Sequence, residues 1–185
     1  MDYAQEAINS LLWIVKTLAM TAVVFSFSIF LLVRFTHWGK QFWQFAGGYL
    51  SPRRSIKPLL FFLLIVAMTL VSVRISLVHS EWYNNMYTSL QEFNEPVFWD
   101  QMVLFCVIAT SSVIAALLSY YLEQRFSINW IEWLNSQLVD KWMDNRAYYK
   151  TQYVSANLDN PDQRIQQDVQ SYVRTTLSLS TGVID

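Results

Sequence analysis

Three apolar stretches dominate this sequence, and each is long enough to cross a lipid bilayer. They are Leu11–Val33, Leu59–Val78 and Met102–Leu122. A membrane-spanning helix needs about 20 mostly apolar residues at a rise of ~1.5 Å per residue. The chain has 185 residues and is 54% hydrophobic and 16% aromatic, which is unusual for a soluble domain. We therefore expect an all-α membrane protein with three spans.

The basic and acidic residues between the spans indicate how the chain is oriented. The segment Arg34–Lys57 contains five Lys or Arg residues and no acid, whereas Ser80–Gln101 contains four acids and no Lys or Arg. Because basic loops remain on the cytoplasmic side, we expect residues 34–57 inside and residues 80–101 outside. Residues 1–10 are then outside, and the chain after the third span is cytoplasmic. No small-residue cleavage site follows the first span, so it is expected to be retained.

The cytoplasmic segment 34–57 contains an aromatic stripe typical of a short surface helix. Trp38, Phe42, Phe45 and Tyr49 are spaced by four, three and four residues, which places them on one helical face. Such an elbow helix lies at the inner membrane interface, or its aromatic face packs against other protein. Gly47, Gly48 and Pro52 are expected to end it.

Two basic residues interrupt the first two spans, and a charge at membrane depth is costly. Lys16 and Arg74 each lie one or two turns from the predicted outer end of their spans. Either their side chains extend to the outer surface, or Arg74 lines a hydrated cavity between helices. A permease needs such a polar lining.

The third helix is predicted to continue into the cytoplasm over residues 123–153. Phe126, Trp130, Leu134, Leu138 and Trp142 repeat every four residues, and no Gly or Pro occurs before Pro161. At ~1.5 Å per residue, about 25 residues of helix reach roughly 35–40 Å beyond the membrane.

A turn over residues 154–164 is predicted to reverse the chain and begin a further helix. Asn160 is a favoured N-cap residue, Pro161 suits the first turn, and Gln163 stands where a capping box places its amide. Asp162 adds negative charge at the positive end of the helix dipole. The helix continues over residues 165–185 as the start of a fourth span, with an apolar face that includes Val169, Tyr172, Val173 and Leu177.

Several kinds of chemistry find no support in the sequence. No G-x-x-x-x-G-K-[ST] phosphate loop occurs, so this stretch contains no ATPase motif. The two histidines, His37 and His79, have no neighbouring ligand residues, so no metal site is expected. Six basic and seven acidic residues between Glu123 and Arg174 leave no basic field for nucleic acid.

Four segments together resemble the transmembrane half of SbmA/BacA-type bacterial ABC transporters, whose relatives include the peroxisomal ABC subfamily D. They are WYNNMYTSLQ (82–91), WIEWL (130–134), AYYK (147–150) and DNPDQRIQQDV (159–169), and RFTHWGKQFWQ (34–44) also fits. Within that group the likeness is greatest to mycobacterial permeases fused to an ATPase, which take up cobalamin and hydrophilic compounds including peptides.

The resemblance implies an exporter-type fold in an inner membrane, with Leu11–Val33 as an extra leading helix and 58–185 as the first part of the transmembrane domain. It implies that Asp159, Asn160, Pro161, Asp162, Gln163 and Arg164 contact a nucleotide-binding domain. That domain, which lies outside this sequence, would bind ATP and Mg²⁺, so the sequence is expected to be an N-terminal portion. A homodimer is likewise implied.

Two other functions are compatible with the same residues. A non-enzymatic three-span adaptor would present its cytoplasmic helix to a soluble partner. A small self-associating channel would use small-residue faces, for which Ala109, Ser112 and Ala116 provide a weak pattern.

Overall fold

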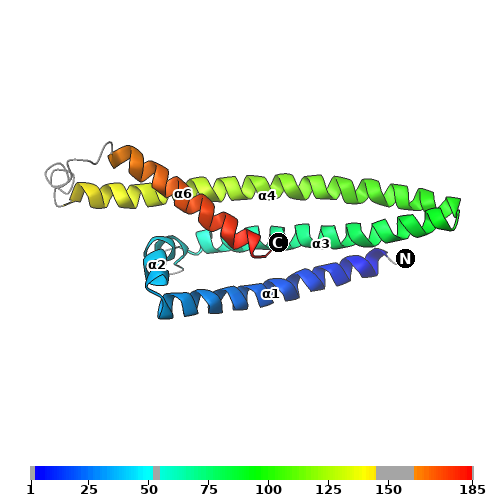
Figure 1. Cartoon of the computed structure of the whole chain (residues 1–185), viewed down its shortest axis with the longest axis horizontal. Helices are drawn as coiled ribbons and strands as arrows, with labels where there is room; N and C mark the ends of the chain where they lie inside the picture. Colours follow the sequence, from blue (N-terminus) through cyan, green and yellow to red (C-terminus); the bar gives the residue numbers. More distant parts are fainter. Residues whose placement is uncertain (1–2, 52–54, 145–160, 185) are drawn as a thin grey trace. The chain divides into compact units, whose positions relative to one another are not determined.

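The computed structural model describes residues 3–51, 55–144 and 161–184, and every regular element among them is an α-helix. Figure 1 shows the five helices, which together make an all-α membrane protein. They are α1 (Tyr3–Phe35), α2 (His37–Leu50), α3 (Lys57–Gln91), α4 (Glu95–Met143) and α6 (Pro161–Gly182).

Three of these helices are long and apolar enough to cross a membrane, which confirms the three predicted spans. The segments are Ile8–Phe35, Lys57–Gln91 and Glu95–Met143. The helices extend beyond the apolar stretches that predicted them. α4 continues as one helix to Met143, as the four-residue repeat predicted; residues 145–153 of the predicted extension lie outside the described residues.

The chain forms two compact units. The first contains residues 1–28, 63–122 and 184–185, and the second contains residues 29–62 and 123–183. In the first unit α3 and α4 run side by side in opposite directions (Figure 1). The indole N–H of Trp82 donates to the carbonyl of Gln101 at 2.8 Å, and the ring centroids of Trp82 and Phe105 are 4.8 Å apart.

The turn between α3 and α4 is much shorter than the outer segment predicted from charge. Residues 92–94 separate the two helices, so most of segment 80–101 is helical. The N–H of Asn94 donates to the carbonyl of Ser89 at 3.0 Å, and the N–H of Phe93 donates to that of Leu90 at 3.3 Å. This is the Schellman pattern, which satisfies the last carbonyls of a helix.

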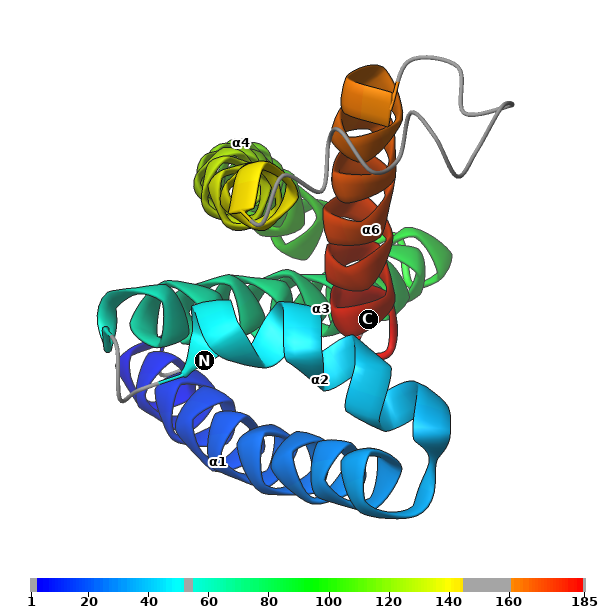
Figure 2. The same cartoon turned by 90° about the vertical axis from the view of Figure 1, so that its left-hand side faces the viewer.

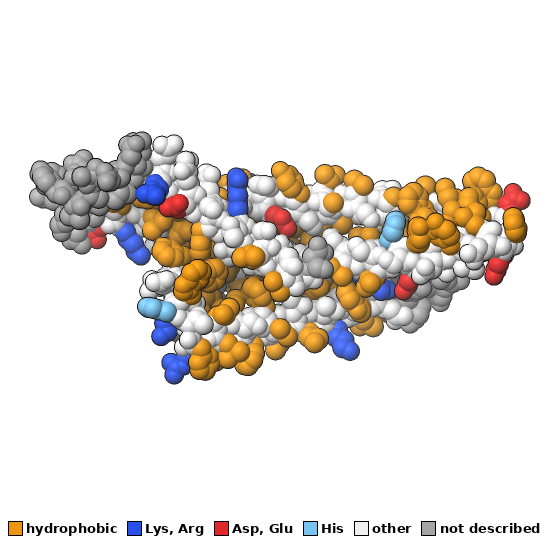
Figure 3. Space-filling view, viewed as in Figure 1, with side chains coloured by type: hydrophobic (Ala, Val, Ile, Leu, Met, Phe, Trp, Pro, Cys, Tyr) orange, Lys and Arg blue, Asp and Glu red, His pale blue; other side chains and the backbone are white. Residues whose placement is uncertain are grey.

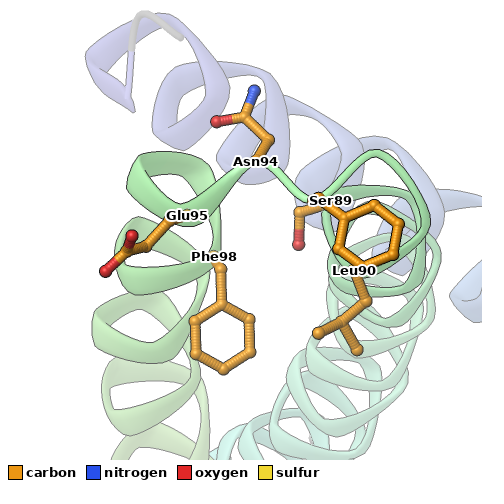
Figure 4. A pocket seen from close by; sticks show the side chains of 6 residues that line it. Ser89, Leu90, Asn94, Glu95 and Phe98 are labelled. Atoms are coloured by element: carbon orange, nitrogen blue, oxygen red, sulfur yellow. The ribbon is translucent and has the colours of Figure 1, made fainter.

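Phe93 occupies the left-handed position of this turn, which glycine normally takes. Its φ is 51° and its side chain is 94% exposed. A bulky residue in this region carries backbone strain. Beside it lies an open, apolar pocket of about 310 Å³ (Figure 4), lined by Ser89, Leu90, Phe93, Asn94, Glu95 and Phe98.

The second unit packs α2 and α6 against the part of α4 that follows residue 122. Figure 2 shows α6 beside α4, with α2 below them in this view. The buried apolar side chains come from all three helices and from the start of α3: Ala46, Phe62, Phe126, Trp130, Leu134, Val169, Val173 and Leu177. The stripes predicted along α4 and α6 are therefore confirmed for their central members.

The corner between α1 and α2 is fixed by a capped turn. The Thr36 hydroxyl accepts from the N–H of Gly39 at 3.0 Å and donates to the carbonyl of Leu32. Gly39 is required because a Cβ atom would collide with that same Leu32 carbonyl. The Thr36 side chain thus caps α2 and ties its first turn to the last turn of α1.

The prediction that Gly47 and Gly48 end the elbow helix is wrong, because α2 continues to Leu50. Both glycines are packing positions instead. A Cβ atom on Gly48 would stand 2.8 Å from Cη2 of Trp133, and one on Gly47 would stand 2.6 Å from the Trp43 ring. Close packing of indole rings therefore outweighs the weak helix propensity of glycine here. Pro52 lies outside the described residues.

Replacing Phe93 by glycine is expected to stabilise the protein. Removal of the strained φ raises the free energy of unfolding by about 1–2 kcal/mol. The greater conformational entropy of glycine in the unfolded chain cancels roughly half of this increase. Thermal unfolding of the purified full-length protein in detergent should show a higher midpoint for Phe93→Gly. The matched change Tyr87→Gly, at an exposed helical position of α3, should lower it. A lower midpoint for Phe93→Gly would contradict the strained turn.

Candidate functional site

The predicted coupling segment, Asp159–Arg164, leads into the first turn of α6. α6 begins at Pro161, as the capping residues predicted. Asp159 and the proposed cap Asn160 lie outside the described residues, as does the Asp162 side chain. Gln163 and Arg164 are both exposed. The N-terminal end of α6 therefore presents exposed polar side chains that are available for contact with another domain.

The opposite face of α6 is anchored in the second unit. Val169, Val173 and Leu177, which follow one another at intervals of four residues, are at most 6% exposed. Arg174 and Gln167 are exposed on the other face. α6 therefore has one apolar face that packs on neighbouring helices and an exposed N-terminal end.

Tyr172 connects α6 to two other helices. Its hydroxyl donates to the backbone carbonyl of Phe42 in α2 at 3.2 Å. Its ring centroid is 5.7 Å from that of Phe42, 5.9 Å from that of Phe45 and 6.1 Å from that of Trp130 in α4. One side chain thus contacts both the elbow helix and the long helix.

Tyr49 makes the corresponding connection from α2 to α4. Its ring lies parallel to the indole of Trp130, with an interplanar angle of 4° and centroids 5.6 Å apart. It also packs at 5.6 Å from Phe126 and 5.4 Å from Trp133. Such aromatic pairs contribute about 0.5–1.5 kcal/mol each beyond their buried area.

We call this cluster the aromatic junction. It consists of three residues of α2, three of α4 and one of α6: Phe42, Phe45, Tyr49, Phe126, Trp130, Trp133 and Tyr172. Phe126 is fully buried and Trp130 is 1% exposed. Nε1 of Trp130 has no acceptor among the described residues, so ring packing rather than hydrogen bonding holds this indole.

The junction decides between the two interpretations of the elbow stripe. Three of its four members, Phe42, Phe45 and Tyr49, pack against α4 or α6, whereas Trp38 is 85% exposed. The aromatic face therefore packs mainly on protein. Sequence reasoning missed Tyr172 as a contact because its partner Phe42 is 130 residues away in the chain.

Burial changes the acidity of the tyrosine at the centre of the junction. It raises the pKa of Tyr172 from its ordinary value near 10 to about 12, and a hydrogen bond with Thr176 opposes part of this increase. Burial also raises the pKa of Tyr49. Burial thus keeps the Tyr172 and Tyr49 side chains neutral, so each hydroxyl retains a proton that it can donate in a hydrogen bond.

Arg74 lies in the first unit, near the start of α1. Its Nε donates to the Ser10 hydroxyl at 3.2 Å, and its guanidinium carbon is 5.9 Å from the centroid of the Trp13 ring. The side chain therefore links α3 to the leading helix. Its role in lining a cavity stays a prediction, which labelling of a cysteine at position 74 by an impermeant reagent would test.

Comparison with known proteins identifies the family. Residues 46–185 match the family described as ABC transporter transmembrane region 2. The chain belongs to this family. The match covers residues 46–50 of α2 and all of α3, α4 and α6, so five of the seven members of the aromatic junction and the whole coupling segment lie within an ABC transporter transmembrane region.

Proteins similar to this chain occur in bacteria and in humans. A Haemophilus influenzae protein described as an uncharacterized ABC transporter ATP-binding protein is 84% identical over all 185 residues of this chain, which spans 31% of its length. The Escherichia coli inner membrane ABC transporter ATP-binding protein YddA is 32% identical over 68% of the chain and 23% of its own length. The human lysosomal cobalamin transporter ABCD4 is 27% identical over 73% of the chain and 22% of its own length.

Loss of the Tyr172 hydroxyl is expected to destabilise the protein in a pH-dependent way. Tyr172→Phe removes the bond of the hydroxyl to the Phe42 carbonyl and its bond with Thr176, each of which contributes about 0.5–1.5 kcal/mol near neutral pH. Since the folded pKa is about 12, the unfolded chain releases this proton first, so the contribution falls as pH rises from about 10 to about 12. Thermal midpoints of the two proteins should therefore converge over that range.

Tyr121→Phe, at an exposed position of α4, is the matched control for the loss of one phenol. A constant difference between the native protein and Tyr172→Phe across the alkaline range would contradict the buried, neutral Tyr172.

Proposed function

We propose that this chain is the first part of an exporter-type ABC transporter domain that moves hydrophilic solutes across the inner membrane, driven by ATP hydrolysis in a separate nucleotide-binding domain. The observation that carries this is the exposed start of α6 on a helix whose other face is anchored in the aromatic junction. The transmembrane family match supports the transport role, and the ATP-binding names of the bacterial relatives support the motor domain.

The proposed substrates are peptides and cobalamin-like compounds, as in the SbmA/BacA group. The name of the human relative, a cobalamin transporter, supports the second of these. ATP and Mg²⁺ belong to the nucleotide-binding domain. The complete transporter is proposed to be a homodimer, as the resemblance implies.

The proposed orientation places residues 34–57 and 123–164 in the cytoplasm. Five Lys or Arg residues and no acid between positions 34 and 57 support this side, and the acids of segment 80–101 support an outer hairpin turn. The N-terminus is then outside. The coupling segment consequently lies where a cytoplasmic nucleotide-binding domain can reach it.

The junction would transmit motion in three steps. The nucleotide-binding domain displaces the coupling segment, and α6 moves with it because the two are continuous in the chain. Val169 and Val173 are buried and Tyr172 is bonded to α2, so the displacement passes to α2 and α4. Packed interiors transmit such displacements because they are close-packed and hardly compressible.

A contact between the coupling segment and the nucleotide-binding domain is directly testable. Cysteines at Gln163 and Arg164 of the full-length protein, in a cysteine-free background, are labelled with a photoactivatable maleimide. A protease site introduced between the two domains then reports crosslinking as a band that survives cleavage. We expect crosslinks from both positions and a change in their yield when ATP is added.

A cysteine at Arg174 is the matched control, because it is exposed on the same helix about 15 Å further along. It should give little or no crosslink. Absence of crosslinks from both Gln163 and Arg164 in a transport-active protein would overturn the assigned coupling role.

A further inference from the structure

The α1–α2 corner carries exposed positive charge. Arg34, His37 and Lys40 are all exposed, and none of the three has an acidic partner among the described residues. The sequence has no Asp or Glu between positions 34 and 57. Figure 3 shows basic and histidine side chains next to hydrophobic ones over this corner. No acidic side chain among the described residues therefore neutralises the positive charge of this corner.

Two large aromatic side chains stand between these basic residues. Phe35 is 78% exposed and Trp38 is 85% exposed, which makes them among the most exposed aromatic side chains of the described chain. Aqueous exposure of both rings would be unfavourable, at about 25 cal/mol per Å² of apolar surface. Trp38 also differs from its stripe partners, which pack into the aromatic junction. A partner at this corner should thus be both anionic and apolar.

The position of the corner indicates what that partner is. The first candidate span ends at Phe35, and its last turns expose Phe30, Leu31 and Leu32. The exposed apolar surface of α1 thus continues directly into the corner. At the end of a span, apolar chains and headgroup phosphates occur together in the bilayer itself, and tryptophan is favoured at this depth.

The corner is also held in one conformation before it meets a partner. Thr36 caps α2 and bonds to the last turn of α1, and Gly39 lies against the Leu32 carbonyl. The backbone between Arg34 and Lys40 is thereby fixed. Little conformational entropy is lost when such a preorganised surface binds.

We propose that the α1–α2 corner is a binding site for an anionic phospholipid. Arg34 and Lys40 contact the headgroup phosphate, while Phe35 and Trp38 insert beside the upper part of the acyl chains. His37 lies between them at the membrane surface. The site is separate from the aromatic junction and does not depend on the coupling role, so each can fail without the other.

Quenching of Trp38 fluorescence by brominated lipids tests this site. The full-length transporter is reconstituted into vesicles of phosphatidylcholine and phosphatidylglycerol in which only one lipid carries bromine on its acyl chains. The difference between the native protein and Trp38→Leu isolates the Trp38 signal from that of all other tryptophans in the protein. We expect brominated phosphatidylglycerol to quench Trp38 more than brominated phosphatidylcholine at equal mole fraction.

Removal of the charges should remove this preference. One basic residue near an anionic surface changes lipid association by roughly fivefold, so Arg34→Gln with Lys40→Gln should bring the two lipids close to equal quenching. Raised salt should have a similar effect. Arg174→Gln, an exposed basic residue on α6, is the matched control and should leave the preference unchanged.

Three outcomes would overturn the proposal. Equal quenching by both lipids in the native protein would show an interfacial helix without headgroup preference. No quenching by either lipid would show that other protein covers Trp38. Loss of the preference on addition of inorganic phosphate at constant ionic strength would show a site for soluble anions rather than for lipid.

Discussion

The parallel packing of the Tyr49 ring on the Trp130 indole is the contact on which the second unit depends. It places α2 against α4, and Tyr172 of α6 then fits against the Trp130 ring and the two phenylalanines of α2. Because Phe126 and Trp130 are almost fully buried, removal of either ring would leave a void among packed neighbours, which costs about 3–5 kcal/mol in well-packed interiors.

This packing explains how a short surface helix gains a structural role. An isolated helix of 14 residues is marginally stable in water. α2 is stabilised by the Thr36 cap at its start and by the aromatic junction along its face, and its glycines let indole rings approach the backbone. The aromatic face of α2 packs on α4 and α6 rather than on lipid. α2 thus connects α1 to the two helices that precede and follow the coupling segment in the chain. The exposed residues at the corner remain available for the membrane surface.

Periodicity and capping chemistry predicted much of the fold. The repeat through Phe126, Trp130 and Leu134 gave the continuous helix and its buried face, and Pro161 marked the start of α6. These features depend on residues within a few turns of one another, which is why a sequence alone reveals them.

Features that depend on distant partners were not predictable. Gly48 lies inside a helix because the Trp133 ring, 85 positions later in the sequence, occupies the space that a side chain would fill. Tyr172 could be placed on an apolar face but not assigned to the Phe42 carbonyl, and Arg74 could not be assigned to Ser10. Phe93 adopts a left-handed conformation without glycine or asparagine to indicate it. Tertiary contacts decided the positions of Gly48, Tyr172 and Arg74, whereas Phe93 is exposed in a local turn.

The aromatic junction transmits motion only if α2 and α6 move as one body. Pulsed electron paramagnetic resonance between spin labels at Gln44 of α2 and Arg174 of α6, both exposed, measures this directly in the full-length transporter. If the junction is rigid, the distance distribution will be narrow and will stay the same with and without ATP, and Tyr49→Leu with Tyr172→Leu will broaden it. A distance that changes with nucleotide in the native protein would contradict transmission through the junction.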